Sequence, residues 1–434
     1  MAEIKQRGKD GEPEDGAPVA GDAGPEVDPF AAHASAVAAE ATGAPAPAGD
    51  LVAGGKAGSI LNALSVPSLA IITALVIGAL IIIGTDQTAL DNWPYLFTDP
   101  GGTLKVFGQV VYNAYKALFL GAFGSASAVS EMLLVTTPLI FAGLSVAIGF
   151  RAGLFNIGAE GQITVGAIAA TAAGFSFAGM PGPLHLALIV GAGFLGGAIW
   201  GAIPGILKAR TGAHEVITTI MLNYVSYRLA DYLLTTHFYR RPDRFDPISK
   251  PVTSAMPHLF GSGYRANVNI LIALGVAAGV AWLLNRTTIG FEFKAVGANP
   301  TAARAAGMSP TRTFVTVMAL AGGVAGLAAS AQLTGPTPSL TPGFSSGFGF
   351  DAIALALVGK AKPSGVVAAA FLFGILKAGS RNMQAATATP VDIVTIIQAL
   401  IIMFVAAPAL VRAIYRIRAR RVVGPEVFTK GWGG

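Results

Sequence analysis

The sequence predicts an all-α membrane protein of about ten transmembrane helices, with an inverted repeat and two interrupted helices. Of the 434 residues, 53% are apolar and only 12% are charged, about half the charge of a typical soluble domain. Nine apolar stretches are long enough to cross a bilayer, and a tenth is weaker. Two glycine-punctuated stretches also interrupt the apolar pattern, which is typical of transport proteins.

A helix needs ~20 apolar residues to cross the hydrocarbon core of a membrane. The weaker tenth stretch, 343–359, is apolar from Phe344 to Val358 but contains Asp351. The nine clear stretches are 66–84, 127–148, 156–177, 183–206, 216–237, 268–285, 314–334, 365–381 and 391–411.

Lysine and arginine in short loops set the orientation, because cytoplasmic loops carry an excess of both. The basic segment 286–313 and the basic tail after residue 411 are therefore expected in the cytoplasm. An even number of crossings must separate them, so the weak span is required and both termini lie inside. Stretch 103–122 then cannot cross, and we expect an external interfacial helix there. The loop 238–267 fits least well, because it carries five basic residues and parity places it outside.

The two ends of the chain have their own compositions. Residues 1–58 carry four basic and ten acidic side chains among many Ala, Gly and Pro, so we expect a disordered acidic cytoplasmic tail. This tail has no basic region leading into an apolar core, unlike a signal peptide. The predicted transmembrane domain covers 59–411, and residues 412–434 form a basic cytoplasmic tail.

Several kinds of chemistry are excluded. The chain has no cysteine, so it can form no disulfide, cysteine nucleophile, iron–sulfur cluster or Cys-ligated zinc site. Its five histidines lack metal-ligand spacing, and no phosphate-binding Gly-x-x-x-x-Gly-Lys-[Ser/Thr] occurs. No basic stripe interleaved with aromatics suggests nucleic acid. We expect no metal, no cofactor and no enzymatic activity in this chain.

The two interrupted helices are predicted at the third and eighth spans. Residues 155–162 open the third span and residues 342–351 open the eighth, each with several glycines and one carboxylate. The third span runs outward and the eighth runs inward, so the order of spans 2–4 recurs in spans 7–9 with reversed orientation. Paired interruptions in inverted halves indicate a transport pathway near the repeat axis.

Polar and aromatic side chains near these breaks are the candidates for the pathway. A charge in lipid costs at least ~2.5 kcal/mol, so each carboxylate should face water or hydrogen-bond donors. Two structural alternatives stay open: each carboxylate caps its own broken helix, and the asparagine and aromatic side chains serve packing. The candidate pathway residues are Asn156, Glu160, Gln162, Asn223, Phe348, Phe350 and Asp351.

Other features favour structural roles. Glu131 is expected at the membrane interface, Arg228 and Asp231 can form an ion pair three residues apart, and Lys377 can snorkel. The glycine-rich stripes 191–201 and 322–326 suit close helix packing.

The cytoplasmic segment 286–313 contains a predicted short helix of about two turns. Asn299 or Thr301 can cap it, Pro300 suits its first turn and Gly307 can end it. Its alanines offer a small knob to a groove on another protein, although a surface helix without a partner has the same pattern. The residues expected to couple to a partner are Gly297, Asn299, Pro300, Ala302, Ala303, Arg304, Ala306 and Gly307.

The stretch 155–162 reads FNIGAEGQ and resembles permease subunits of bacterial ABC importers for nucleosides, within the wider group of ribose and branched-chain amino-acid permeases. The resemblance covers roughly residues 125–410. The stretches 1–58 and 103–122 have no counterpart in the family's usual pattern. Further matching stretches are 151–153, 214–217, 221–224, 297–307, 349–354 and 357–359.

This resemblance implies a subunit that depends on partners in the bacterial cytoplasmic membrane. Two permeases, as homodimer or heterodimer, would form the pathway through the lipid. Two ATPase subunits would dock on 297–307, and an external substrate-binding protein would deliver a nucleoside or related polar solute. The alternatives are a secondary transporter, with Glu160 or Asp351 carrying a proton, and a structural membrane scaffold.

Overall fold

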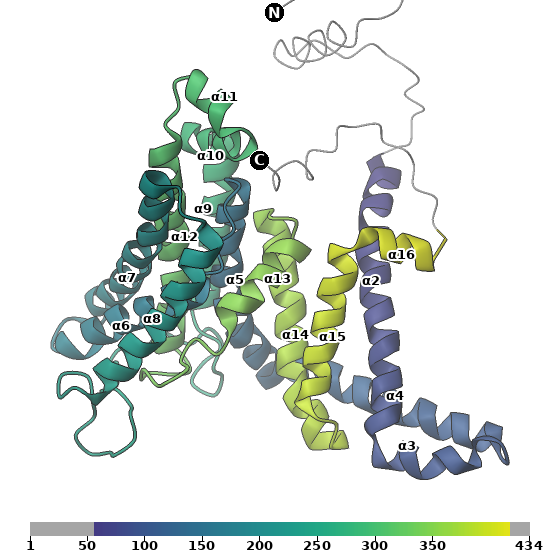
Figure 1. The fold of residues 1–434 in the computed structure, drawn as a ribbon. Helices are drawn as coiled ribbons and strands as arrows, with labels where there is room; N and C mark the ends of the chain where they lie inside the picture. The colour runs from purple at the N-terminus through teal and green to yellow at the C-terminus, as the bar shows by residue number, and fades with distance from the viewer. Residues whose placement is uncertain (1–55, 417–434) are drawn as a thin grey trace, which may run out of the picture. The chain divides into compact units, whose positions relative to one another are not determined.

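The described residues, 56–416 of the computed structural model, fold into helices joined by loops, without a named strand. The chain divides at Leu61, and everything described from Asn62 onward belongs to one compact unit. The tail predicted for 1–58 and the basic tail after 411 lie mostly outside the described residues. The helices, shown in Figure 1, are α2 (Lys56–Thr85), α3 (Gln87–Asn92), α4 (Pro100–Phe123), α5 (Ala126–Arg151), α6 (Ala159–Ser176), α7 (Gly182–Thr211), α8 (Glu215–Thr235), α9 (Asn269–Arg286), α10 (Thr288–Ala298), α11 (Pro300–Ala305), α12 (Pro310–Leu333), α13 (Phe348–Val358), α14 (Pro363–Thr387), α15 (Val391–Ala406) and α16 (Pro408–Ile414), with a 3₁₀ turn η1 (Trp93–Leu96).

Six helices of the described chain are long and apolar enough to cross a membrane: most of α2, and α5, α7, α9, α12 and α14. A seventh span is formed if α15 and α16, which are bent by 93° at Ala407, count as one. The prediction treated 391–411 as one uninterrupted span. The bend arises because Pro408 cannot continue the hydrogen bonding of α15. The predicted spans at 156–177 and 216–237 are helices α6 and α8, which are more polar, and 343–359 holds the short apolar helix α13.

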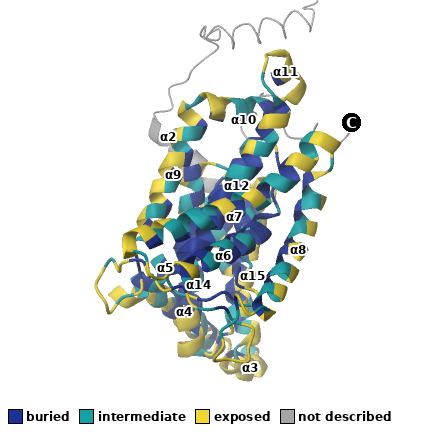
Figure 2. Ribbon diagram, turned by 90° about the vertical axis from the view of Figure 1, so that its left-hand side faces the viewer, coloured by how far each residue is buried: buried dark blue, intermediate teal, exposed yellow. Residues whose placement is uncertain are grey.

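Helices α5 and α12 form the centre of the core. In the most apolar part of each helix, 83% of the residues of α5 and 72% of those of α12 are buried. The corresponding fraction is only 28% to 33% in α2, α7 and α9. Figure 2 shows this gradient from dark blue interior to yellow exterior. The outer helices expose the rest of their apolar side chains, as expected for surfaces that face lipid or another subunit.

Helices α7 and α12 approach each other through glycines. A Cβ added at Gly197 would lie 2.2 Å from the Gly322 carbonyl oxygen, and one at Gly326 would lie 2.0 Å from that of Gly193. No side chain fits at these contacts, so the backbones themselves touch. The glycine stripes therefore serve packing, as the sequence indicates.

The unit has two opposite ends, which we name by their contents. At the α11 end, Arg151 donates to the Ala361 carbonyl at 2.8 Å, and Gly153 just after it touches Gly297 of the segment 286–313. At the loop end, Arg265 pairs with Glu131 at 3.1 Å and His185 bonds Ser254 at 2.8 Å. Segments 286–313 and 238–267 thus lie at opposite ends (Figure 1), as the predicted parity requires.

The stretch 103–122 lies within α4, which starts from an Asp99 cap that accepts a hydrogen bond from Gly102 N–H. In Figure 1 α4 runs across the loop ends of α14 and α15 rather than along them. Gly121 allows close contact with Gly379 of α14, and Tyr115 donates to the Leu75 carbonyl of α2. The interfacial placement of this helix stays a prediction.

Candidate functional site

One face of α8 carries a polar stripe into the interior. Its buried residues recur every three or four positions, so they lie on one side of the helix. The stripe is polar near the α11 end and apolar toward the loop end. Its members are Glu215, Thr219, Asn223, Ser226, Ala230 and Leu234.

This stripe holds the non-helical connector 152–158 between α5 and α6. Asn223 accepts from Gly161 N–H at 2.9 Å and donates to the Ile157 carbonyl at 3.0 Å. Asn156 and Gln162 exchange two amide hydrogen bonds, at 3.0 and 3.1 Å. Backbone that leaves the helical pattern away from water needs such partners, so these amides stabilise the break.

Glu160 joins the starts of α6 and α13. Its carboxylate is 2% exposed and accepts three hydrogen bonds from the entry to α13: from the Ser345 hydroxyl at 2.6 Å and from the N–H groups of Gly347 and Gly349 at 3.1 and 2.6 Å. One structural alternative was that this carboxylate caps its own broken helix. Instead it caps the other one, where the positive end of the helix dipole favours an anion.

The contact between the two helix starts is tight. A Cβ added at Gly349 would lie 2.2 Å from the backbone nitrogen of Glu160, so only glycine fits there. Tyr227 of α8 also interacts with the Glu160 carboxylate. We call this group the Glu160 junction: Glu160, Tyr227, Ser345, Gly347 and Gly349.

Asp351 has a different environment. Lys377 of α14 pairs with it, and the Lys377 ammonium also lies 5.3 Å from the centre of the Phe348 ring. Both members of the ion pair keep 29% of their side-chain surface exposed. Lys377 thus has a partner in the protein, where the sequence suggested only that it could snorkel.

The predicted pathway residues divide into two groups. Asn156, Glu160, Gln162 and Asn223 converge and are buried, each engaged with protein groups. Of the α13 residues, Phe348 is buried, Asp351 is half-buried and Phe350 is 50% exposed. The predicted ion pair of Arg228 and Asp231 is confirmed at 3.2 Å.

Sequence reasoning missed two members of the Glu160 junction, Tyr227 and Ser345. Tyr227 lies four positions after Asn223, so the stripe of α8 could have indicated it. Ser345 lies 185 positions from Glu160, and no local pattern reports that contact.

The short helix α11 is built as the sequence predicts. Asn299 caps it by accepting from Thr301 and Ala302 N–H at 3.0 Å each, Pro300 is its first residue, and Gly307 follows with a left-handed φ of 86°. The six residues make it slightly shorter than two turns. Ala303 is 4% exposed and faces the protein, whereas Ala302, Ala305 and Ala306 are exposed.

Helix α10, just before α11, rests on the connector. A Cβ at Gly297 would lie 2.6 Å from the carbonyl carbon of Ala152, and one at Gly153 would lie 2.9 Å from the Gly297 oxygen. Gly153 has φ 69°, a conformation that costs other residues energy. Displacement of α10 would therefore press directly on the connector that leads to Glu160.

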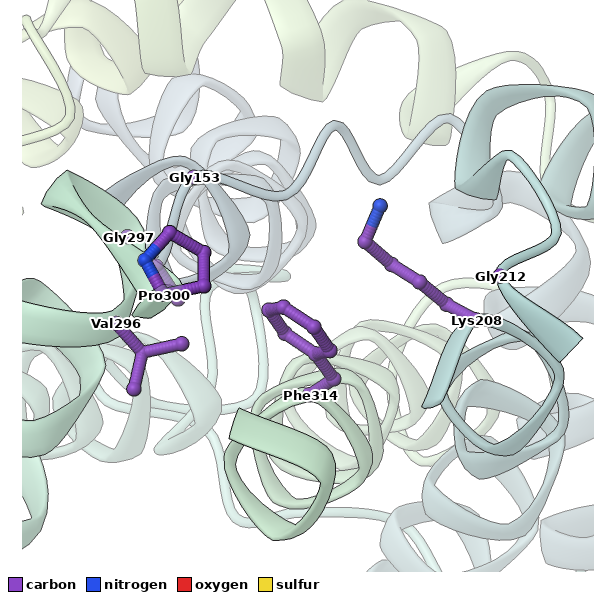
Figure 3. Close-up of a pocket in the computed structure, with 8 residues that line it drawn as sticks. Gly153, Lys208, Gly212, Val296, Gly297, Pro300 and Phe314 are labelled. Carbon is purple, nitrogen blue, oxygen red and sulfur yellow. The ribbon is translucent and has the colours of Figure 1, made fainter. Parts of the chain in front are cut away.

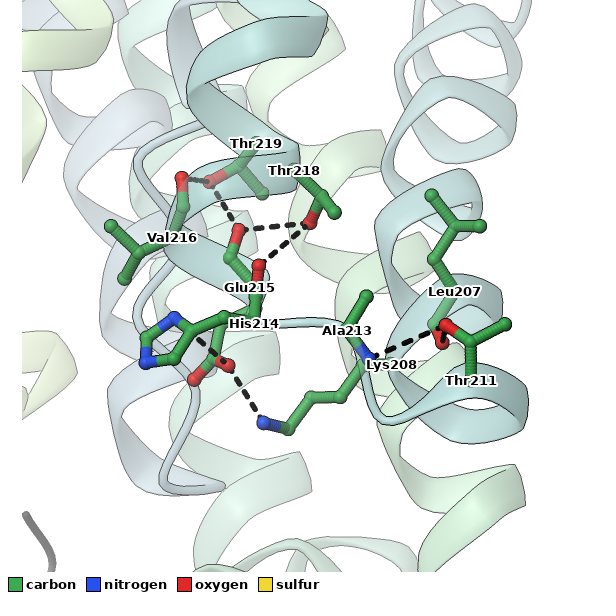
Figure 4. A network of polar contacts seen from close by, with 9 residues as sticks. All are labelled: Leu207, Lys208, Thr211, Ala213, His214, Glu215, Val216, Thr218 and Thr219. Carbon is green, nitrogen blue, oxygen red and sulfur yellow. Dashed lines mark hydrogen bonds and ion pairs between the residues drawn. The ribbon is translucent and has the colours of Figure 1, made fainter. Parts of the chain in front are cut away.

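A pocket of about 330 Å³ opens beside this contact (Figure 3). On its far side, Lys208 at the end of α7 pairs with Glu215 at the start of α8, at 2.7 Å (Figure 4). Within residues 56–416, no group of three His, Asp or Glu side chains could hold a metal ion. The pocket is lined by Ala152, Gly153, Lys208, Gly212, Val296, Gly297, Pro300 and Phe314.

Residues 128–406 match the family described as branched-chain amino acid transport system / permease component. The chain belongs to this family. It is a multi-pass membrane permease subunit of an ABC-type importer. No solved structure matches it.

Similar permeases are known from both bacteria and an archaeon. The guanosine ABC transporter permease protein NupP of Bacillus subtilis is 39% identical over 81% of this chain and 95% of its own. The nucleoside ABC transporter permease protein NupB of Lactococcus lactis is 36% identical, over 70% and 85%. The glucose ABC transporter permease protein TsgB13 of Haloferax volcanii is 35% identical, over 67% and 79%.

Proposed function

We propose that this permease imports a nucleoside or a related small polar solute, with the α11 end in the cytoplasm. Ten crossings follow if α6, α8 and α13 are added to the six apolar helices and the bent α15–α16 pair. In this orientation α5–α7 and α12–α14 are the inverted halves, each with one interrupted helix. The positive-inside rule supports the placement, because Arg151, Lys208, Lys360 and the segment 286–313 share the α11 end.

The observation that carries the proposal is the Glu160 junction. The starts of the two interrupted helices meet at one buried carboxylate, which is the arrangement expected at the centre of a transport pathway. In this proposal Asn156, Gln162 and Asn223 shape the junction, while Asp351 and the exposed Phe350 border the solute. The base of a nucleoside has a flat aromatic face and polar edges. An exposed phenylalanine ring can stack on that face while neighbouring polar groups bond the edges.

Exposed ionisable side chains on α8, α13 and α14 support a wet pathway. The Arg228 side chain is 85% exposed, and Asp351 and Lys377 are each 29% exposed. Charges facing lipid cost several kcal/mol, so water or a second permease should cover them. We expect a homodimer or heterodimer to enclose this surface.

The proposed partners act at both ends. ATPase subunits would dock on the exposed Ala302 and Ala305 of α11 and on Ala306 just after it, while the buried Ala303 holds the helix in place. Their closure would move α10, press Gly297 on Gly153 and shift the connector to the junction. Such a two-state element is what alternating access requires. An external substrate-binding protein would deliver the solute.

The ion-coupled alternative fits the junction less well. The Glu160 carboxylate already accepts three hydrogen bonds at the entry to α13, which hold it between two helix starts. Asp351 is paired with Lys377.

Uptake in proteoliposomes tests the proposal. With the ATPase and binding protein present, labelled nucleoside should accumulate only with ATP on the α11 side. Ala302→Trp, which changes an exposed residue of α11, should abolish uptake without loss of folded protein, whereas Thr235→Trp at the loop end should not. Accumulation driven by a proton gradient without ATP would refute the proposal.

A further inference from the structure

The loop end carries a short hairpin arm between α8 and α9. Arg240 and Ser249 form an antiparallel bridge, Lys250 N–H donates to the Tyr239 carbonyl at 2.7 Å, and Arg241 N–H donates to Ile248 at 3.1 Å. We call residues 239–250 the arm and residues 242–247 its tip.

The base of the arm is fixed in the permease. Tyr239 is 6% exposed and donates its hydroxyl hydrogen to the Ile168 carbonyl of α6 at 3.2 Å. Ser249 N–H donates to the Leu340 carbonyl at 3.0 Å, and the Ser249 hydroxyl accepts from Leu340 N–H at 2.8 Å. The arm is therefore built on rigid supports rather than left as a free loop.

The tip presents one aromatic ring. Phe245 is 98% exposed, which is unusual for a large apolar side chain in an ordered turn. The Arg240 guanidinium donates to the Phe245 carbonyl at 3.3 Å, which holds the backbone under the ring. A rigid exposed aromatic loses little entropy on binding, and such residues often anchor protein interfaces.

Ion pairs brace the tip on both sides of the ring. Arg241 pairs with Asp243 at 2.9 Å, and Arg244 pairs with Asp246 at 3.1 Å. The hydrogen bond from Arg241 lowers the pKa of Asp243 below its ordinary 3.8. These pairs neutralise Arg241 and Arg244, but the arm as a whole has four basic and two acidic residues.

The segment 236–267 has an excess of positive charge. It contains five basic and two acidic residues, and it lies at the end opposite α11. In the proposed orientation it is external, against the usual distribution of lysine and arginine. Positive charge on an external loop does not favour the proposed membrane orientation. An excess of basic residues there is instead suited to attract an acidic protein surface.

We propose that the tip is a docking site for an acidic surface of the substrate-binding protein. Phe245 enters an apolar pocket of that protein, and carboxylates around the pocket face the arm, whose Arg240 and Lys250 lie outside the two ion pairs. The inference rests on the proposed function, because it requires the loop end to be external.

Docking here can reach the Glu160 junction. The loop stretch 334–340 continues into the residues that Glu160 caps. It accepts three hydrogen bonds from the end of the arm and the residues after it: from Ser249, Val252 and Met256 N–H to the carbonyls of Leu340, Pro338 and Thr334. The two chain segments that lead into the junction are therefore each contacted from one end: α10 touches the connector before α6, and the end of the arm bonds the stretch before α13.

Binding of the purified substrate-binding protein to the permease–ATPase complex in nanodiscs tests the proposal. Phe245→Ala should weaken binding roughly thirtyfold, and Arg244→Glu should weaken it and reduce its salt dependence. Phe260→Ala is the matched control, since Phe260 is another exposed phenylalanine of the same segment. Unchanged affinity in Phe245→Ala would overturn the proposal. Failure of wild-type ATP-driven uptake would instead overturn the proposed function.

A fluorophore distinguishes a protein partner from lipid. The chain has no cysteine, so Phe245→Cys can carry a single environment-sensitive dye. Its emission should shift to the blue only when the binding protein is added. A shift in vesicles with anionic lipid alone would mean that the tip rests on the membrane, and the docking proposal would be wrong.

Discussion

The α7–α12 interface and the Glu160 junction are both places where helices meet closely, but they are held by different interactions. At the interface, glycines bring two backbones into contact with no room for a side chain. At the junction, one carboxylate holds a helix start through three hydrogen bonds. The glycine contact is close-packed, so the two helices cannot slide past each other without steric overlap. The hydrogen bonds of Glu160 can be exchanged for others, so we expect the α7–α12 interface to stay fixed while the Glu160 junction moves.

The largest expected effect is a loss of stability at the fixed interface. Gly197→Ala places a Cβ 2.2 Å from the Gly322 oxygen, and such overpacking costs about 3 kcal/mol. The thermal midpoint of the purified permease should fall by several degrees. Gly191→Ala is the control, because no atom lies within 4 Å of its Cβ. Equal thermal midpoints in the two variants would show that the α7–α12 interface can accommodate an added methyl group, contrary to the prediction.

The contact between α10 and the connector should be of intermediate sensitivity. Gly153→Ala combines a left-handed φ of 69° with a Cβ 2.9 Å from Gly297, so stability should fall by about 2 kcal/mol. Gly212→Ala has the same backbone strain, φ 70°, without a neighbour within 4 Å. Only Gly153→Ala should also impair uptake per ATP hydrolysed. The same loss in Gly212→Ala would assign the effect to strain alone.

The smallest expected effect is at the edge of the junction. Ser345→Ala removes one hydrogen bond to the Glu160 carboxylate, worth about 1.5 kcal/mol when the partner is charged. Uptake should fall by up to tenfold, and the thermal midpoint should fall less than in Gly197→Ala. Ser346→Ala serves as the comparison, since the Ser346 hydroxyl donates to the nearby Phe344 carbonyl rather than to Glu160. A larger loss in Ser346→Ala would move the important contact away from Glu160.

Local features were predictable from the sequence. The cap at Asn299, the start at Pro300 and the glycine end of α11 follow from backbone chemistry within a few residues. The non-helical entries to α6 and α13 overlap the predicted stretches 155–162 and 342–351. These stretches stood out because a carboxylate in an apolar membrane segment costs free energy unless it has polar partners.

Long-range partners were not predictable in the same way. That Glu160 caps the start of α13 depends on how α6 and α13 pack, which no local pattern encodes. The inward orientation of Ala303 likewise depends on how α11 sits on the bundle. The bend before Pro408 could have been predicted, since proline ends a helix, but apolar composition alone suggested a continuous span.

The ratio of solute imported to ATP hydrolysed, measured in proteoliposomes with Glu160→Gln, tests the central claim most directly. The amide has one acceptor oxygen instead of two, so it cannot hold α13 as the carboxylate does. We predict that ATP hydrolysis continues while nucleoside import falls at least tenfold. Glu131→Gln, at the loop end, should leave the ratio unchanged. An unaltered ratio in Glu160→Gln would contradict the account.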